Sequence, residues 1–384
     1  MKNNIKVINH HKTLGFRNPP LPNPYVAKMK EYIIVPQEIW FNKDKKSLLK
    51  LDWNESTFLN LKLHKKIMKL FSEPEYIFWY PDVNCTELTN IIAKHLSLSP
   101  QEILVFAGSD EALEAICSTY LKAEDYVGVV NPSYDNFRIN VERLGAIMKP
   151  VYFKNPFEFN LNAFLKELHN IKSKLKLIYV VNPNNPIGYE IRAKDIESIL
   201  VQFPDKLIII DEAYIDFSGN SSYSLIRKYP NLIITRSFSK AFGLAGLRIG
   251  YTISDIRNHA LLTRIRNGKN ITMFAQRAAK FLLESIDYIN SHIKMICEAR
   301  QWFTEAMRKE GAIVFESSAN FVLMKVPAPK EVILQLRKQN IYARDRSWIK
   351  QLEGTIRITV GYKKQMEIVL NVFRTIDNTY WIFK

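Results

Sequence analysis

One lysine of this chain lies among small hydroxyl residues, in the stretch Ser237-Phe238-Ser239-Lys240. The stretch follows an apolar run at 232–234 that is typical of a short buried strand, and Arg248 comes eight residues after the lysine. Hydroxyl groups and a guanidinium suit a phosphate, and a lysine amine can form a Schiff base with an aldehyde. Pyridoxal 5'-phosphate (PLP) is both an aldehyde and a phosphate ester, so the segment predicts a PLP site. The alternative interpretation is a basic loop on the surface.

Polar residues follow several other short apolar runs. These runs alternate with helical stretches and are bounded by turn residues, a pattern typical of strands buried on both faces of a mostly parallel sheet. Ligands bind beyond the carboxyl ends of the strands in such a sheet. The polar groups at these ends are Asn185 within 182–188, Asp211, Tyr214 and the lysine segment itself. Ser109 and Asp110 begin a predicted helix directly after a strand, where free backbone amides can bind a phosphate.

Asp211 directly follows four apolar residues, at 207–210. A carboxylate in such a place is expected to be buried, and burying a charge is costly unless a cation offsets it. A helix cap or a turn would also explain a single acid. The cost of burial nevertheless favours a functional role for Asp211 beside a cationic partner.

The order of the patterns predicts an α/β fold in three parts. An extended, Pro-, Asn- and Lys-rich N-terminal arm is expected at 1–50, a large cofactor-binding domain at 51–270, and a linker helix with a smaller α+β domain at 271–384. The large domain should hold a mostly parallel central sheet covered by helices. Strands are expected at 103–106, 126–130, 177–181, 207–210, 232–235, 249–252, 320–324 and 355–360, and helical stretches at 61–72, 86–97, 110–121, 271–310 and 328–339.

The composition excludes several classes of protein. The 384 residues contain 47% hydrophobic and 24% charged residues, enough for a substantial core, and no apolar run approaches the ~20 residues of a membrane span. Three scattered cysteines predict neither a disulfide framework nor a metal site, and a cytoplasmic location is expected. The net charge of +16 would suit nucleic acid, but the basic residues are dispersed, so a solvated basic surface is favoured over a nucleic-acid or membrane partner.

At Asn185-Pro186, Asp211, Tyr214, Lys240 and Arg248 the sequence resembles the fold-type I PLP enzymes. Over about 50–365 it is most similar to the histidinol-phosphate aminotransferase branch of that family. The matching phrases are those at 211–217, 239–248, 344–347 and 356–361. The resemblance implies that Lys240 carries the cofactor and shuttles a proton, and that Asp211 keeps the pyridine nitrogen protonated.

The same resemblance assigns roles to the other site residues. It implies that Asn185 and Tyr214 bind the phenolic oxygen of the cofactor and that Tyr134 stacks on its ring. An ordinary core aromatic is the alternative for Tyr134. The implied phosphate site consists of Ser109, Asp110, Ser237, Ser239 and Arg248. Tyr80 matches a residue that reaches the phosphate of a neighbouring subunit, which implies a homodimer with shared active sites.

Four residues match the substrate side of the family. Arg357 matches an arginine that binds a substrate carboxylate, for which a bidentate guanidinium is suited, and its alternative is a surface arginine on an edge strand. Arg344 matches a position that meets the substrate phosphate, and Asn54 and Glu55 match an Asn-Glu pair near the cofactor. The family then usually has a proline-containing turn, where this chain has Ser56-Thr57-Phe58. That departure and the long basic arm put an imidazole-bearing substrate in doubt.

Three functional hypotheses follow. The first is a PLP-dependent aminotransferase acting between glutamate or 2-oxoglutarate and a small phosphorylated amine or carbonyl compound. The second is a decarboxylase of a phosphorylated amino acid such as phosphoserine or phosphothreonine. The third, a regulatory protein of this fold that acts on DNA, is disfavoured because no attached DNA-binding module is recognised.

Overall fold

The computed structural model describes residues 21–31, 38–41, 47–57, 61–72 and 74–383. Its largest element is a seven-stranded sheet with the strand order β2-β8-β7-β6-β5-β3-β4. The strands are β2 (Ile103–Phe106), β3 (Tyr126–Asn131), β4 (Ile147–Tyr152), β5 (Leu175–Val181), β6 (Leu207–Asp211), β7 (Leu232–Ser237) and β8 (Gly250–Ser254). Strand β8 is antiparallel to both of its neighbours, β2 and β7, and all the other strand pairs of this sheet are parallel. The predicted α/β fold with a mostly parallel sheet is therefore confirmed.

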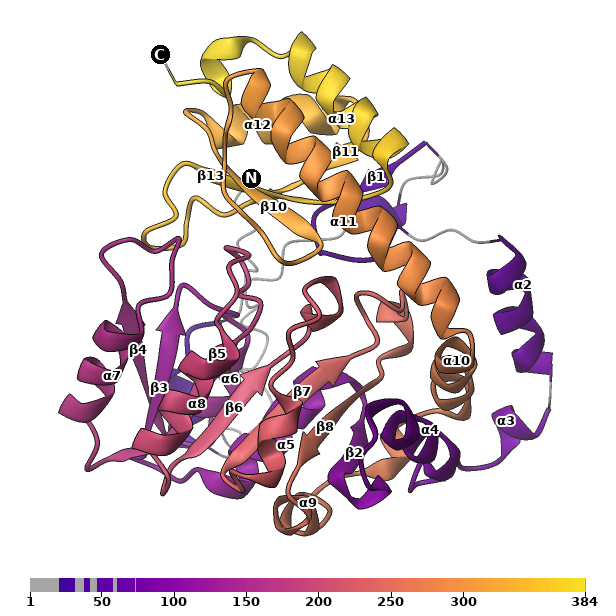
Figure 1. Cartoon of the computed structure of the whole chain (residues 1–384), viewed down its shortest axis with the longest axis vertical. Coiled ribbons are helices and arrows are strands. Elements are labelled where there is room, and N and C mark those ends of the chain that lie inside the picture. The colour runs from indigo at the N-terminus through magenta and orange to yellow at the C-terminus, as the bar shows by residue number, and fades with distance from the viewer. Residues whose placement is uncertain (1–20, 32–37, 42–46, 58–60, 73, 384) are drawn as a thin grey trace, which may run out of the picture.

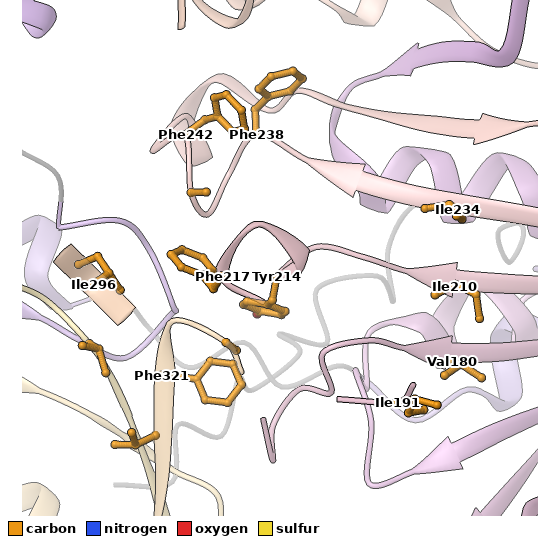
Figure 2. Packing of buried hydrophobic residues seen from close by; sticks show 14 of the residues in the cluster. Val180, Ile191, Ile210, Tyr214, Phe217, Ile234, Phe238, Phe242, Ile296 and Phe321 are labelled. Atoms are coloured by element: carbon orange, nitrogen blue, oxygen red, sulfur yellow. The ribbon is translucent and has the colours of Figure 1, made fainter. Parts of the chain in front are cut away.

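Helices cover both faces of this sheet (Figure 1). They are α4 (Thr86–Leu96), α5 (Gly108–Tyr120), α6 (Phe137–Glu142), α7 (Leu161–Asn170), α8 (Ala193–Gln202) and α9 (Ile256–Leu262). Alternate residues of each strand belong to separate cores: Ile208 and Ile210 pack in one hydrophobic cluster, whereas Ile209 packs in another. Figure 2 shows Val180, Ile210 and Ile234 on neighbouring strands of the first cluster. Burial on both faces explains why these strands are continuous apolar runs.

Strand β4 was not predicted. It lies at the edge of the sheet, where it pairs with β3 alone. Its sequence contains Lys149 and Pro150, and both are only half-buried or exposed. An edge strand tolerates a proline and a charged residue because one side of its backbone has no ladder to complete. The apolar-run signal used for the other strands is therefore missing here.

A second, four-stranded antiparallel sheet has the order β12-β13-β10-β9. Its strands are β9 (Ile313–Val314), β10 (Phe321–Lys325), β12 (Arg344–Asp345) and β13 (Thr355–Thr359), and α12 (Pro329–Lys338) and α13 (Lys363–Thr375) lie nearby. The helical region expected at 271–310 consists of two helices, α10 (Met273–Glu284) and α11 (Ile286–Lys309), which meet at Ser285. Figure 1 shows α11 running from the large sheet's helices to the small sheet, which lies over the ends of β5, β6 and β7.

The described part of the N-terminal segment is not simply extended. It contains the short helix α1 (Pro24–Lys28), and its strand β1 (Leu49–Lys50) pairs in parallel with β11 (Ile341–Tyr342). Helices α2 (Leu61–Lys69) and α3 (Glu75–Phe78) follow. The division of the chain at 50 and 270 into an arm and two domains stays a prediction. In the part of the chain that the structure describes, no helix has the length and apolarity to span a membrane, and no cluster of potential metal ligands occurs.

Gly250 sets how closely β8 approaches the first turn of α5. A Cβ atom at this position would lie 2.6 Å from Arg236 O and 2.8 Å from Ser109 N, both of them backbone atoms. We expect Gly250→Ala to lower the free energy of unfolding by about 1–3 kcal/mol, the usual cost of overpacking, in chemical denaturation. Gly246→Ala is the matched control, because nothing lies within 4 Å of its added Cβ. Equal stability of the two variants would contradict this reading of β8.

Candidate active site

A cavity of about 480 Å³ lies at the carboxyl ends of the parallel strands. Its lining includes most of the residues predicted from the sequence: Glu55, Ser109, Asp110, Tyr134, Asn185, Asp211, Tyr214, Ser237, Ser239, Lys240 and Arg248. Trp40, Trp53, Val181, Ala213, Ala245 and Gly246 complete the lining, and none of them was predicted. The structure therefore brings together residues spread over more than 190 positions of the chain, as a shared edge of parallel strands would require.

One end of the cavity is built to hold an anion. Helix α5 begins at Gly108, so the backbone amides of its first turn, including those of Ser109 and Asp110, lack intrahelical acceptors. Gly108 has a φ of +85°, and a Cβ there would lie 2.7 Å from Arg248 Nη2, so glycine allows the guanidinium to approach the helix end. Helix N-terminus, hydroxyls and guanidinium together suit a phosphate.

Asp110 contributes more than a backbone amide to this end. Its Oδ2 lies 3.0 Å from Arg248 Nη2, and its Oδ1 accepts a hydrogen bond of 2.9 Å from Tyr134 OH. Arg248 is thereby held beside the helix end, and Tyr134 is oriented at the wall of the cavity. The placement of Tyr134 suits the stacking role that the resemblance implies.

The other end of the cavity holds the buried carboxylate of Asp211. This residue is 3% exposed, its Oδ2 accepts a hydrogen bond of 2.8 Å from Tyr179 OH, and its Oδ1 accepts one of 3.2 Å from Ala213 N. Burial raises the pKa of Asp211 to about 6. A group with a pKa near neutrality can respond to a cationic ligand, because a positive charge beside it restores the carboxylate.

Tyr179 was missed by the sequence reasoning. It lies inside the apolar run of β5, where its ring stacks on Phe137 with centroids 3.7 Å apart. The signal that could have found it is the alternation of the strand, since Tyr179 and Val181 share the face that Asp211 also presents. A tyrosine near the end of a buried strand needs a partner for its hydroxyl, and Asp211 supplies one.

Lys240 and Tyr214 also line the cavity. Lys240 Nζ donates a hydrogen bond of 3.2 Å to Trp53 O and lies 5.7 Å from the centroid of the Tyr214 ring. The Tyr214 hydroxyl accepts a hydrogen bond of 3.0 Å from Asn54 Nδ2, which leaves its own proton for a ligand. Tyr214 packs edge-to-face on Phe321 of the small sheet, as Figure 2 shows.

Asn54 does not line the cavity. It is buried behind Tyr214 with a φ of +55°, and its backbone amide donates a hydrogen bond of 3.0 Å to Thr359 Oγ1. It therefore reaches the site through the Tyr214 hydroxyl. Glu55 does line the cavity, and its carboxylate forms an ion pair with Lys50.

Arg357 lies behind Asn185, outside the cavity lining. Its Nη1 donates a hydrogen bond of 2.6 Å to Asn185 Oδ1, and its Nη2 donates one of 2.9 Å to Asp52 O. Because Oδ1 of Asn185 is engaged, Nδ2 of that amide is the group available to a ligand. Arg357 is 3% exposed and β13 lies inside the small sheet, so the alternative of a surface arginine on an edge strand is wrong.

Arg344 faces Arg357 directly across β12 and β13. Residues opposite each other in antiparallel strands share one face of the sheet, so both side chains start from the same side. Burial, together with the charges of Arg346 and Arg344, lowers the pKa of Arg357 well below its ordinary value. A concentration of guanidinium groups of this kind favours an anion beside it.

Tyr80 lies outside the cavity of its own chain. Its side chain is 80% exposed, and Lys269 Nζ lies 5.0 Å from the centroid of its ring. Its neighbours Ile77, Phe78 and Trp79 are 68%, 79% and 71% exposed. These four consecutive residues form a continuous exposed apolar segment, which we call the 77–80 segment.

Comparison with known proteins identifies the family. The sequence model described as aminotransferase class I and II matches residues 46–373. A dihydroxyacetone phosphate transaminase of Campylobacter jejuni is 34% identical over 352 residues, which cover 90% of this chain and 95% of the relative. A histidinol-phosphate aminotransferase of a Thermoanaerobacter species is 32% identical over 324 residues, covering 84% of this chain and 91% of that protein.

Solved structures show the same fold. The histidinol-phosphate aminotransferase of Sinorhizobium meliloti, in complex with PLP, superposes with a TM-score of 0.80 at 24% identity, covering 92% of this chain and 98% of that one. An L-threonine-O-3-phosphate decarboxylase of Porphyromonas gingivalis has a TM-score of 0.72 at 22% identity, over 85% of this chain and 99% of that one. At these identities the likeness concerns the fold.

The raised pKa of Asp211 predicts a pH dependence of cofactor binding. Above a pH of about 6 the residue is a carboxylate that attracts a protonated pyridine, and below it the residue becomes neutral. We therefore expect the affinity for PLP to fall as the pH drops from 7 to 5, by up to roughly 10-fold per pH unit. Asp211→Asn should bind PLP more weakly at pH 7 and lack this part of the pH dependence.

Fluorescence titration of the apoprotein with PLP from pH 5 to pH 8 measures this effect. Subtracting the pH profile of Asp211→Asn from that of the wild type removes the titration of the cofactor itself, which is common to both. Parallel pH profiles for wild type and Asp211→Asn would contradict the assignment of Asp211 to the pyridine nitrogen.

Proposed function

We propose that this chain, a PLP-dependent member of the class I and II aminotransferase family, transfers an amino group between glutamate and a small phosphorylated carbonyl compound. One observation carries the proposal: a single cavity is lined by the Lys240 amine, the buried Asp211 carboxylate and the anion-binding start of α5. An amine for the aldehyde, an acid for the pyridine and an anion site for the phosphate are the three contacts that PLP requires.

The residues fit PLP at both of its ends. At the phosphate end, Gly108 leaves room for Arg248. A Cβ atom at position 108 would lie only 2.7 Å from the nearest atom of the Arg248 guanidinium. At the ring end, Asp211 is buried, and no cation among the described residues forms an ion pair with it. When bound, PLP supplies an aldehyde that amines attack and a ring that withdraws electrons from the carbon next to the amine.

The chain's own residues then have definite tasks. Asp211 would accept a hydrogen bond from the ring nitrogen of the bound cofactor, and Tyr179 and Ala213 hold its carboxylate in place. Tyr214 OH and Asn185 Nδ2 are the free donors that can meet the phenolic oxygen. Lys240 is placed to take a proton from the carbon that bears the amino group and to return it, which is general acid–base catalysis by an amine.

The substrate class follows from what the relatives share. Dihydroxyacetone phosphate and histidinol phosphate, the compounds in the names of the two relatives, both carry a phosphooxymethyl group on the carbon that exchanges its amino group or oxygen. Arg357 and Arg344, concentrated on one face of the small sheet, supply the charge to receive such a phosphate or a carboxylate of glutamate. We therefore propose a 2-amino or 2-oxo alkyl phosphate as the partner of glutamate.

Decarboxylation of a phosphorylated amino acid is the second candidate. Its support is the shared fold of a threonine-phosphate decarboxylase. Incubation with two different substrates separates the reactions. With glutamate, an aminotransferase produces 2-oxoglutarate and changes the cofactor's absorbance, whereas a decarboxylase releases carbon dioxide from phosphoserine or phosphothreonine without a keto acid.

A cytoplasmic site of action agrees with Cys85, Cys117 and Cys297, which are all free thiols.

Lys240→Ala tests the central assignment. We expect the purified variant to lose the visible absorbance of the lysine-bound cofactor and to react with glutamate at least ~100-fold more slowly, since general acid–base catalysis by a side chain contributes about 10²–10⁴. Absorbance spectra before and after addition of glutamate measure both effects. A colourless wild-type protein after loading with PLP would exclude both the aminotransferase and the decarboxylase.

We also propose that the active unit is a homodimer. The 77–80 segment exposes four large apolar side chains in succession, and contiguous exposed apolar patches commonly mark interaction surfaces. Tyr80 lies in this segment and outside its own cavity, so a second copy is the partner to which it could contribute. The resemblance of Tyr80 to a residue that reaches a neighbouring cofactor supports the same arrangement.

Phe78→Lys combined with Trp79→Lys should convert the dimer to a monomer, because the two charges would have to be buried in the interface. Sedimentation velocity measures the change in mass. Val201→Lys is the control, since Val201 is also exposed, at 58%, but lies on α8. A monomeric wild type, or a variant that stays dimeric, would count against the proposed interface.

A further inference from the structure

Two tryptophans lie in the wall of the cavity and have no role in the mechanism described so far. Trp53 directly precedes Asn54, and Trp40 belongs to the 3-10 turn Glu38–Phe41. Glu55 completes this part of the lining. Of the three, Trp53 has the best-defined surroundings, and these indicate what its indole does.

The backbone around Trp53 is held from several directions. Trp53 O accepts the hydrogen bond of 3.2 Å from Lys240 Nζ, and the carbonyl of the preceding Asp52 accepts one of 2.9 Å from Arg357 Nη2. The next residue, Asn54, is tied to the small sheet by bonds of 3.0 Å to Thr359 Oγ1 and 3.1 Å from Asn320 Nδ2. Arg357 and Lys240 therefore fix the backbone at Asp52 and Trp53, in the wall of the cavity that Lys240 also lines.

A third substituent of the reacting carbon has to fit into this same cavity. That carbon carries the amino group or oxygen, the phosphooxymethyl group, and one further group. Lys240 and Trp53 line the same cavity, so a substrate whose reacting carbon lies near Lys240 shares that space with the indole, and the further group is what the indole limits. A shift of the Trp53 backbone would break the hydrogen bonds made by Asp52 O, Trp53 O and Asn54 N, so the indole cannot be displaced along with its backbone.

Space and charge at this wall favour a small, uncharged group. The cavity of about 480 Å³ is in the lower part of the ~300–1,000 Å³ range of ligand sites, yet it has to hold both the cofactor and the substrate. Lys50 Nζ lies 5.4 Å from the centroid of the indole and forms ion pairs with Asp52 and Glu55. Both carboxylates near the indole thus already share a cation.

We propose that Trp53 limits the third substituent of the substrate, so that the site accepts a triose-sized phosphate with a hydroxymethyl group and excludes an imidazole-bearing one. This inference rests on the proposed aminotransferase function. The reaction is then glutamate plus dihydroxyacetone phosphate giving 2-oxoglutarate plus 2-amino-3-hydroxypropyl phosphate. The α-carbon of glutamate gives up its amino group and a hydrogen and gains an oxygen, and the keto carbon of the phosphate ester does the reverse. The equation therefore balances without an external oxidant or reductant.

The test compares two amine donors on the PLP-loaded enzyme, each with 2-oxoglutarate: 2-amino-3-hydroxypropyl phosphate and histidinol phosphate. We expect wild type to favour the smaller donor in kcat/KM by at least ~10-fold, within the ~10–200-fold that a pocket wall can provide. Trp53→Ala should shift this ratio toward histidinol phosphate by at least ~10-fold. Trp53→Leu provides the same comparison should the alanine variant fail to fold.

Trp348→Ala is the matched control, because Trp348 is 61% exposed and does not line the cavity. It should leave the ratio unchanged. A ratio that stays the same in Trp53→Ala and Trp53→Leu, or a wild type that prefers histidinol phosphate, would overturn the inference. The reaction of wild type with glutamate alone tests the proposed function separately: failure there concerns the aminotransferase, whereas an intact glutamate reaction with an unchanged ratio concerns only Trp53.

Discussion

The burial of one carboxylate, Asp211, is the constraint on which the rest of the site depends. Burial raises its pKa to about 6, above the ordinary value of 3.8, so the folded protein without a cation retains the proton more strongly than the unfolded chain does. The stability that this provides is fully present below the unfolded pKa and is lost as the pH rises through about 6. At neutral pH the free site therefore holds a charge at a cost, and a cationic ring beside Asp211 offsets it.

A buried ion pair holds the strands that carry this site. Glu212 and Arg236 are the neighbours of Asp211 and Ser237 in the chain, and Arg236 Nη2 lies 2.9 Å from Glu212 Oε2. Glu212 also accepts a hydrogen bond of 2.8 Å from Ser222 N. Because successive residues of a strand point to opposite faces, this pair joins β6 and β7 on one side while Asp211 and Ser237 face the cavity on the other. Removing one partner alone would leave an uncompensated buried charge.

The segment 49–57 links the two sheets to the site. It pairs with β11 through β1, receives Arg357 at Asp52 O and Lys240 at Trp53 O, and positions Tyr214 through Asn54. A short stretch of chain therefore connects Arg357 of the small sheet with Lys240.

Much of the cofactor side could be predicted from the sequence. Apolar runs buried on both faces reveal parallel strands directly, and the polar residues that follow them must gather at one edge, so Asp211, Tyr214, Asn185 and the lysine segment could be placed together from their order alone. The edge strand β4 was not predicted because a strand that pairs on one side alone need not be a continuous apolar run. Tyr179 was not predicted because a tyrosine inside an apolar run resembles an ordinary core residue until its hydrogen-bond partner on the next strand, Asp211, is known.

The substrate side depended on tertiary structure. Residue types and spacing determined that the chain has a lysine, an acid and the start of a helix at the ends of strands in one sheet, since these relations follow from the local periodicity of strands. Only folding decided that Arg357 lies behind Asn185, that Asn54 contacts Tyr214, and that Lys240 and Arg357 bind the carbonyls of Trp53 and Asp52. Those contacts join segments 160–305 positions apart, and no periodicity in the chain encodes how two separate sheets pack against each other.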